Sequence, residues 1–165
     1  MLDAMTQDDL LKPFILKIWI KRDAEAIQRF WTRSDDLVRW FLASAKYFDA
    51  SGAEVSIAVP GGTYEWRWIE GTTDRSSVKA VEHGRIVLGW MHDKGEIELT
   101  FTQSSGETMV ELKQTIETGS VEDRLSDQIG CQLGWTFFLA NLKSVSEGGL
   151  DLREKDPARV PVLNY

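Results

Sequence analysis

The feature of this 165-residue chain that most constrains its fold is a long apolar helix near the C-terminus. Helix-compatible sequence runs from Val121 to Glu147, between a capping-box-like start at Ser120 and a stop at Gly148-Gly149. At about 1.5 Å per residue this helix would be roughly 40 Å long. Two apolar stripes run along it, one of Leu125, Ile129, Leu133, Phe137 and Ala140, the other of Trp135, Phe138, Leu142 and Val145. We therefore expect a wrapping sheet or a second subunit to cover the helix on most sides.

The residues before this helix are typical of an antiparallel sheet with one apolar face. Phe14 to Ile20 alternate as a strand, and two short helices are predicted after Asp23 and from Ser34, both residues that can cap a helix. The further predicted strands are residues 44–50, 54–59, 63–69, 77–82, 85–91, 96–103 and 108–117. Their connections are short, which requires antiparallel neighbours, and Pro60-Gly61-Gly62 predicts a hairpin between 54–59 and 63–69.

A sheet with one apolar face and a long apolar helix must pack together. A sheet of this many strands curls as it twists, and a helix across its concave side leaves space wherever side chains do not meet. Such a space is a natural site for a small molecule. The length fits one domain spanning residues 1–165, with a loose lead-in at 1–12 and an extended tail at 150–165.

Charge and cysteine content narrow the function classes. The net charge of −7 argues against a nucleic-acid partner, which usually needs a basic surface. The single cysteine, Cys131, cannot form an internal disulfide, so a reducing compartment is expected. We find no signal peptide and no apolar run long enough to span a membrane. These features together predict a cytoplasmic protein.

The candidate cavity walls are residues on the predicted inner face of the sheet and helix: Trp66, Trp68, Trp90, Leu112, Gln114 and Phe137. Trp rings make good apolar walls, although the same rings could simply fill the core. A buried amide needs partners, so Gln114 could orient a ligand or could bond Trp indoles or the backbone.

We expect no catalytic residues, no metal site and no cofactor. His83 and His92 lie in turns with no cluster of ligand-spaced side chains around them. Cys131 lies well inside the long helix and has no evident base, so an inert buried thiol is the better interpretation. Glu96 and Glu98 could serve as paired carboxylates in acid–base catalysis, but on an outward strand face they are expected to be only solvated. Gly61-Gly62 lacks the pattern of a phosphate-binding loop, so no nucleotide is expected.

Several segments of the chain are similar to the SRPBCC (START-like) superfamily, and within it to the activator of heat-shock-protein-90 ATPase homologues. The similarity covers nearly everything except the first and last dozen residues. It is carried by the opening strand, Phe30-Trp31, Trp40-Phe41, Gly62-Thr63-Tyr64 leading into Trp66 and Trp68, Ile86-Val87-Leu88-Gly89-Trp90 and, most specifically, the ten residues from Gly134 to Lys143, GWTFFLANLK. The resemblance implies an α+β helix-grip fold, a curved antiparallel sheet around the long helix, with an interior cavity.

This resemblance leaves three functions open, because its relatives include lipid and hormone binders, aromatic polyketide cyclases and chaperone cofactors. We favour non-enzymatic binding of a small hydrophobic or amphipathic molecule between helix and sheet. A cyclase- or hydrolase-like enzyme would need an inward polar dyad. A chaperone partner is not favoured, because only a dozen residues stand where that co-chaperone's N-terminal domain is expected. The second helix stripe and the tail also make a homodimer a reasonable expectation.

Overall fold

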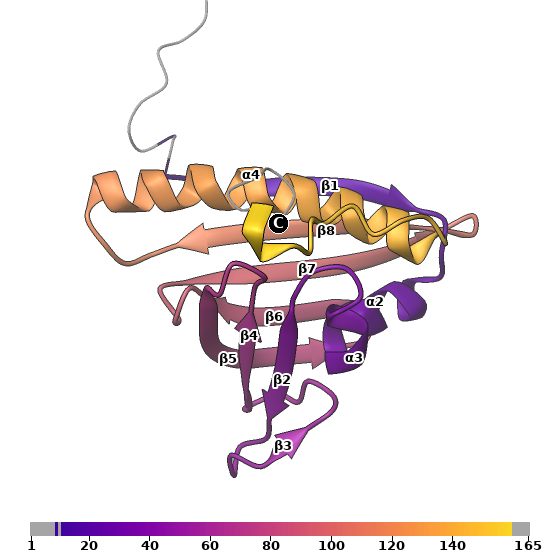
Figure 1. Ribbon diagram of the computed structural model, residues 1–165, viewed down its shortest axis with the longest axis horizontal. Helices are drawn as coiled ribbons and strands as arrows, with labels where there is room; N and C mark the ends of the chain where they lie inside the picture. The colour runs from indigo at the N-terminus through magenta and orange to yellow at the C-terminus, as the bar shows by residue number, and fades with distance from the viewer. Residues whose placement is uncertain (1–8, 10, 160–165) are drawn as a thin grey trace, which may run out of the picture.

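The computed structural model describes residues 9 and 11–159, and it confirms the predicted helix-grip fold. Figure 1 shows a curved sheet with the long helix lying along one end of it. The elements in chain order are β1 (Phe14–Ile20), α2 (Ala24–Thr32), α3 (Ser34–Leu37), β2 (Ser44–Phe48), β3 (Glu54–Val55), β4 (Thr63–Arg67), β5 (Thr73–Glu82), β6 (Arg85–Trp90), β7 (Gly95–Ser104), β8 (Glu107–Ile116), α4 (Val121–Ser146) and a 3₁₀ turn (Pro157–Arg159).

The sheet has eight strands in the order β1-β8-β7-β6-β5-β4-β2-β3, all paired antiparallel. Strand β5 is the corner: its first half, Thr73–Ser77, pairs with β4, and its second half, from Val78, pairs with β6. The register shifts between Val78 and Ala80, and such a bulge bends a strand and increases its twist. As a result β4, β2 and β3 curl round in front of β5 to β7 (Figure 1).

The predicted hairpin at Pro60-Gly61-Gly62 is wrong. Glu54–Val55 is only two residues long and pairs with β2, while β4 pairs with β2 and β5. The reason is that the turn closes onto the corner strand: Gly61 N–H donates to Val78 O at 2.8 Å, and Val78 N–H donates to Gly62 O at 2.9 Å. Strand β5 also begins at Thr73 rather than at residue 77. Residues 73–76 pair with β4, but they are all polar and therefore show no apolar alternation in the sequence.

The core is strongly aromatic and lies between the sheet, α4 and the two short helices. Trp31 of α2 contacts Trp40 with ring centroids 4.8 Å apart and Trp135 of α4 at 5.7 Å. Phe41 contacts both Trp135 and Phe138, at 5.1 and 4.8 Å. These contacts fix where the middle of α4 sits on the sheet.

The helix starts are only partly as predicted. At α4, Ser120 caps as expected: its Oγ accepts the Asp123 N–H at 3.2 Å. At α2, Asp23 occupies the cap position without a side-chain cap bond, and the Ala24 N–H instead donates to Gln103 Oε1 at 2.6 Å. At α3, Ser34 is the first helical residue, so it does not cap.

Of the two covers predicted for α4, the sheet supplies one side only, and a second subunit stays a prediction. Trp135, Phe138 and Leu142 are buried against the sheet, whereas Ile129 and Leu133 are 60% and 67% exposed. None of the helices in the described part of the chain is long and apolar enough to cross a membrane.

The predicted lead-in and tail fall partly on residues 1–8, 10 and 160–165, which lie outside the described residues. Residues 149–156 have no regular secondary structure. Their best-fixed residue is Arg153, which is 7% exposed and donates to Leu42 O and Val38 O at 3.0 and 2.9 Å. The chain after α4 is therefore bound back onto the α3–β2 connection.

Candidate functional site

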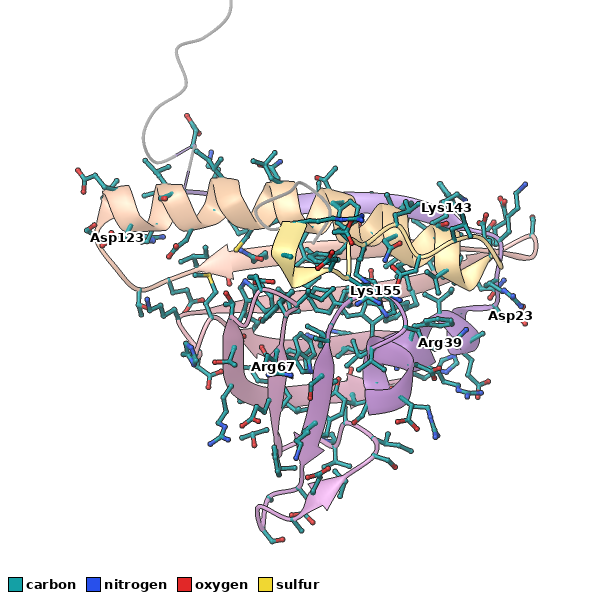
Figure 2. The ribbon with its side chains drawn as sticks, viewed as in Figure 1. Asp23, Arg39, Arg67, Asp123, Lys143 and Lys155 are labelled. Atoms are coloured by element: carbon teal, nitrogen blue, oxygen red, sulfur yellow. The ribbon has the colours of Figure 1, made fainter. Side chains whose placement is uncertain are left out.

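A pocket of about 580 Å³ lies between the middle of α4, the β4–β5 loop and the β6–β7 turn. Its apolar lining includes Trp68, Trp90, Met91, Leu133, Phe137 and Phe138. Its polar lining consists of Glu70, Thr72, Thr73, Asp74, His92 and Lys94, which the two loops and the start of β5 supply. Figure 2 labels Asp123 near the N-terminal end of α4 and Lys143 in its C-terminal half, and the pocket residues of α4 lie between these two labels. This volume and the mixture of apolar wall and few polar groups are typical of small-molecule sites.

A smaller recess of about 180 Å³ shares Trp68, Trp90, Cys131, Gly134 and Phe138 with the main pocket. Phe41 and Trp135 also line it, so it reaches the aromatic core. The pocket therefore has an apolar inner end, and its polar groups come from the loops.

Two glycines of α4 leave the pocket open on the helix side. Gly130 and Gly134 are one helical turn apart, both line the smaller recess, and a Cβ at either would meet no atom within 4 Å. Glycine inside a helix costs about 1 kcal/mol relative to alanine. The helix thus carries two destabilising residues where side chains would occupy the pocket.

The β6–β7 turn that forms the rim has a strained backbone. Met91, His92 and Asp93 have φ angles of +56°, +57° and +59°, a left-handed conformation that residues other than glycine adopt at a cost of about 1–2 kcal/mol each. Side chains of β5 hold it: the Met91 and His92 N–H groups donate to Asp74 at 3.0 and 2.7 Å, and the Asp93 N–H donates to Ser76 Oγ at 3.1 Å. Strain of this kind clusters at functional sites.

Asp74 is the buried acid of the pocket wall, 4% exposed. Besides the two backbone N–H groups, Ser76 Oγ donates to its Oδ1 at 2.9 Å, and Tyr64 OH lies 2.7 Å from both its Oδ2 and the carbonyl oxygen of Gly89, so one hydroxyl proton serves the two acceptors. Burial and the neighbouring Asp74 charge hold the pKa of the Tyr64 hydroxyl well above its usual value. His92 Nδ1 lies 3.7 Å from Asp74 Oδ1, beyond hydrogen-bond distance.

Cys131 is half-buried on the helix side of the pocket. Its Sγ accepts from Trp90 Nε1 at 3.4 Å and lies 3.7 Å from Met91 Sδ. Burial raises the pKa of the Cys131 thiol, which keeps it protonated and weakly nucleophilic. In residues 9 and 11–159, no three His, Cys, Asp or Glu side chains come close enough together to hold a metal ion.

The structure brings together only some of the side chains proposed from the sequence as walls. Trp68, Trp90 and Phe137 line the pocket. Trp66, Leu112 and Gln114 are fully buried in the core and are not part of the lining. Gln114 Oε1 accepts from Trp135 Nε1 at 2.7 Å, so its amide fixes α4 on β8.

Sequence reasoning missed other residues that shape the pocket. The spacing of Gly130 and Gly134 in an otherwise good helix was a usable signal, because glycine inside a helix lowers stability and two of them one turn apart mark a face without side chains. Asp74 gave no such signal, since its burial depends on the turn of the neighbouring hairpin.

Comparison with known families settles the relationship of the chain. The model of the family described as Activator of Hsp90 ATPase homolog 1-like protein matches residues 21–147. The chain belongs to this family. The match confirms the resemblance inferred from the sequence, and it includes every residue of the pocket lining named above. No curated protein matches the sequence.

Solved structures similar to this family member share its fold at low identity. SSP2350 from Staphylococcus saprophyticus is 19% identical with a TM-score of 0.68, and the match covers 86% of this chain and 96% of that one. The Aha1 dimer from Colwellia psychrerythraea is 19% identical with a TM-score of 0.64, covering 83% and 97%. DynU16, from the dynemicin biosynthetic locus, is 13% identical with a TM-score of 0.67, covering 87% of this chain and 50% of its own. These likenesses show the fold alone.

Proposed function

We propose that this protein binds a small hydrophobic or amphipathic molecule in the pocket between α4, the β4–β5 loop and the β6–β7 turn. The observation that carries the proposal is the pair Gly130 and Gly134, which leaves empty space on the pocket side of a helix at a cost in stability. The aromatic inner end would hold the apolar part of the ligand, and the loops would face its polar part.

The variant Gly134→Leu tests this proposal, because Gly134 lines the pocket and a Cβ there meets no atom within 4 Å, so a larger side chain would take up pocket space. We expect the binding of a neutral solvatochromic dye such as Nile red to fall at least tenfold, about 1.4 kcal/mol. The free energy of unfolding should rise by up to about 1 kcal/mol, since leucine is the better helix former. Dye titration and urea denaturation measure the two effects separately.

Ala140→Leu is the matched control, since Ala140 is an exposed position further along the same helix. It should leave dye binding within twofold of the unmodified protein. Equal dye affinity in the Gly134→Leu variant and the unmodified protein would contradict the proposal, because the added side chain would then have filled no binding space.

We also propose that the protein forms a homodimer through the exposed stripe of α4. Ile129 and Leu133 are large apolar side chains left in solvent on one helix face, and a structural relative has been solved as a dimer. Sedimentation velocity should show a dimer for the unmodified chain and a monomer for Ile129→Glu/Leu133→Lys. A monomer at high concentration for the unmodified chain would refute this.

A cytoplasmic location is the third proposal. Its support is Cys131, a free thiol half-buried beside the sulfur of Met91, which a reducing compartment would keep unoxidised. Fractionation of cells with an antibody to the protein should place it in the cytosolic fraction, and recovery from a secreted fraction would contradict the proposal.

A further inference from the structure

The charged side chains that line the pocket differ in burial, and this difference bears on the chemical class of the ligand. Asp74 is 4% exposed, and each of its carboxylate oxygens accepts a backbone N–H, from His92 at 2.7 Å and from Met91 at 3.0 Å. Both oxygens of this carboxylate therefore act as hydrogen-bond acceptors. All four of its hydrogen-bond donors are uncharged groups, so they satisfy its oxygens without neutralising its charge.

The other charges of the pocket lie on its solvent side and largely offset one another. Glu70 and Lys94 are both exposed and carry opposite charges. Exposed charges are screened by water and salt, whereas a buried charge acts through a medium of lower dielectric constant. Among the ion pairs of the described residues, the basic partner of Asp74 is the imidazole of His92, at 3.7 Å and 62% exposed. The pocket interior therefore carries an excess of negative charge.

The aromatic walls favour the same sign of charge. Trp68 and Trp90 lie with ring centroids 5.9 Å apart and ring planes at 80°, so they form two adjoining walls. The face of an indole carries negative electrostatic potential and attracts cations within about 6 Å of its centroid. Two tryptophan walls beside a buried carboxylate match the needs of an organic cation, which has an apolar shell around its positive charge.

We propose that the ligand is an amphipathic organic cation, an amine or quaternary ammonium on an apolar body, with its cationic group between Trp68, Trp90 and Asp74. The inference rests on the proposed ligand-binding function and deepens it. The apolar body lies toward Phe138 and the recess beside Gly134. The cationic group supplies the charge partner that Asp74 lacks among the buried groups.

A series of three probes that differ only in charge tests this proposal. Each has a phenylpropyl body, and it ends in trimethylammonium, in the neutral tert-butyl isostere or in a carboxylate. Calorimetric titration should give an affinity for the cation about tenfold above that for the neutral isostere, in the range of a desolvated cation–π contact plus a buried charge. The carboxylate should bind more weakly than the neutral compound.

Two variants test whether Asp74 and Trp68 cause the tighter binding of the cationic probe. Asp74→Asn should reduce the cation's advantage over the neutral isostere to about twofold or less, and Trp68→Leu should reduce it while keeping an apolar wall. Glu54→Gln is the matched control: it removes one acidic charge from β3, at the end of the sheet furthest from α4 in Figure 1, and should leave the advantage unchanged. Trp68→Leu keeps the test decisive if Asp74→Asn does not fold, since Trp68 makes no part of the Asp74 hydrogen-bond network.

Salt gives a second measurement on the unmodified protein. A preference that comes from the buried Asp74 should persist at high ionic strength, whereas one that comes from the net charge of −7 should disappear. Equal binding of cation and neutral isostere, tighter binding of the carboxylate, or loss of the preference in high salt would overturn the inference and leave the binding pocket standing. Failure of all three probes to bind, together with unchanged dye binding in Gly134→Leu, would overturn the proposed function as well.

Discussion

The side chains of Asp74 and Ser76 hold the β6–β7 turn in a conformation that its own residues disfavour. Met91, His92 and Asp93 are left-handed in succession, and three N–H groups of the turn donate to these two side chains. Asp93 Oδ1 also accepts from Ser77 N–H and Oγ, at 3.1 and 2.7 Å. The turn thus places His92 on the rim of the pocket at the cost of backbone strain.

Glycine substitution measures this strain. His92→Gly should raise the free energy of unfolding by about 1 kcal/mol, because glycine adopts a positive φ without a steric penalty. Lys94→Gly, in the same turn at a residue without a positive φ, should lower it by about 0.5–1 kcal/mol. Urea denaturation checks both values, and a loss of stability in His92→Gly would mean that the turn is not strained.

Arg153 joins three parts of the chain through one buried guanidinium. It bonds Val38 O and Leu42 O and pairs with Asp151, whose Oδ1 also accepts from Asn141 of α4 at 3.0 Å. Burial alone would raise the pKa of the Asp151 carboxyl, but hydrogen bonds from Arg153, Lys155 and Asn141 outweigh it and hold that pKa far below its usual value. This network fixes the segment after α4.

Removal of Arg153 should therefore be costly. Arg153→Ala should lower the free energy of unfolding by about 2–4 kcal/mol, less than a fully buried pair because Asp151 keeps some exposure. Arg159→Ala, which removes an exposed guanidinium that pairs with Glu154 and Asp156, should change it by less than about 0.5 kcal/mol. Equal effects of the two substitutions in urea denaturation would contradict the role given to Arg153.

The same pair predicts the response to acid. The pKa of Asp151 is lower in the folded protein than in the unfolded chain, so its contribution is complete above the unfolded value of about 4 and is lost as pH falls below that. In Asp151→Asn the free energy of unfolding should be lower at neutral pH and should fall less steeply below about pH 4. Denaturation curves over this range that run parallel for the two proteins would contradict the assignment.

Among the helices and strands, α4 has both a packing role and a binding role. One side is fixed by Trp135 and Leu142 in the core, and the side at Gly130 and Gly134 opens on the pocket. Its start depends on Ser120, whose hydroxyl caps the first turn and also donates to Asp123 Oδ2 at 2.8 Å.

The cap can be tested against a serine in the same helix. Ser120→Ala should lower the free energy of unfolding by about 1 kcal/mol through loss of the cap. Ser126→Ala, at an exposed position inside α4, should leave it unchanged or slightly higher, since alanine is the better helix former. A thermal or urea denaturation series that ranks the two variants the other way would contradict this helix start.

The start of α4, the strand faces and the helix-grip class could be predicted because they depend on local patterns, such as the alternation in β8 and the capping signal at Ser120. The pairing of β3 with β2 could not, because it depends on the corner strand capturing Gly61 and Gly62. Three of the proposed wall residues, Trp68, Trp90 and Phe137, line the pocket. Leu112 and Gln114 have the same inward alternation but are buried in the core outside the lining, and a sequence pattern cannot separate these two environments.

For the protein as a unit, the site depends on the curl of the sheet. Its lining comes from three segments far apart in sequence, Trp68–Asp74, Trp90–Lys94 and Cys131–Phe138, which meet only after β5 turns its corner.

A ligand that contacts all three of these segments should stabilise the whole fold against unfolding. At a probe concentration of one hundred times its Kd, the free energy of unfolding should rise by about 2.7 kcal/mol. If Gly134→Leu binds the probe at least tenfold more weakly, the same concentration should stabilise that variant by no more than about 1.4 kcal/mol, which denaturation with and without probe would measure.

The location of the bound molecule can be read most directly from the indole N–H signals of the seven tryptophans in a ¹H–¹⁵N spectrum, assigned by single Trp→Phe variants. On titration with the trimethylammonium probe, the signals of Trp68 and Trp90 should shift together and saturate. Trp19, which is 46% exposed on β1, and Trp31, buried in the core, should keep their positions. Shifts at Trp19 with none at Trp68 and Trp90 would place the ligand elsewhere on the molecule and contradict the binding pocket described for this protein.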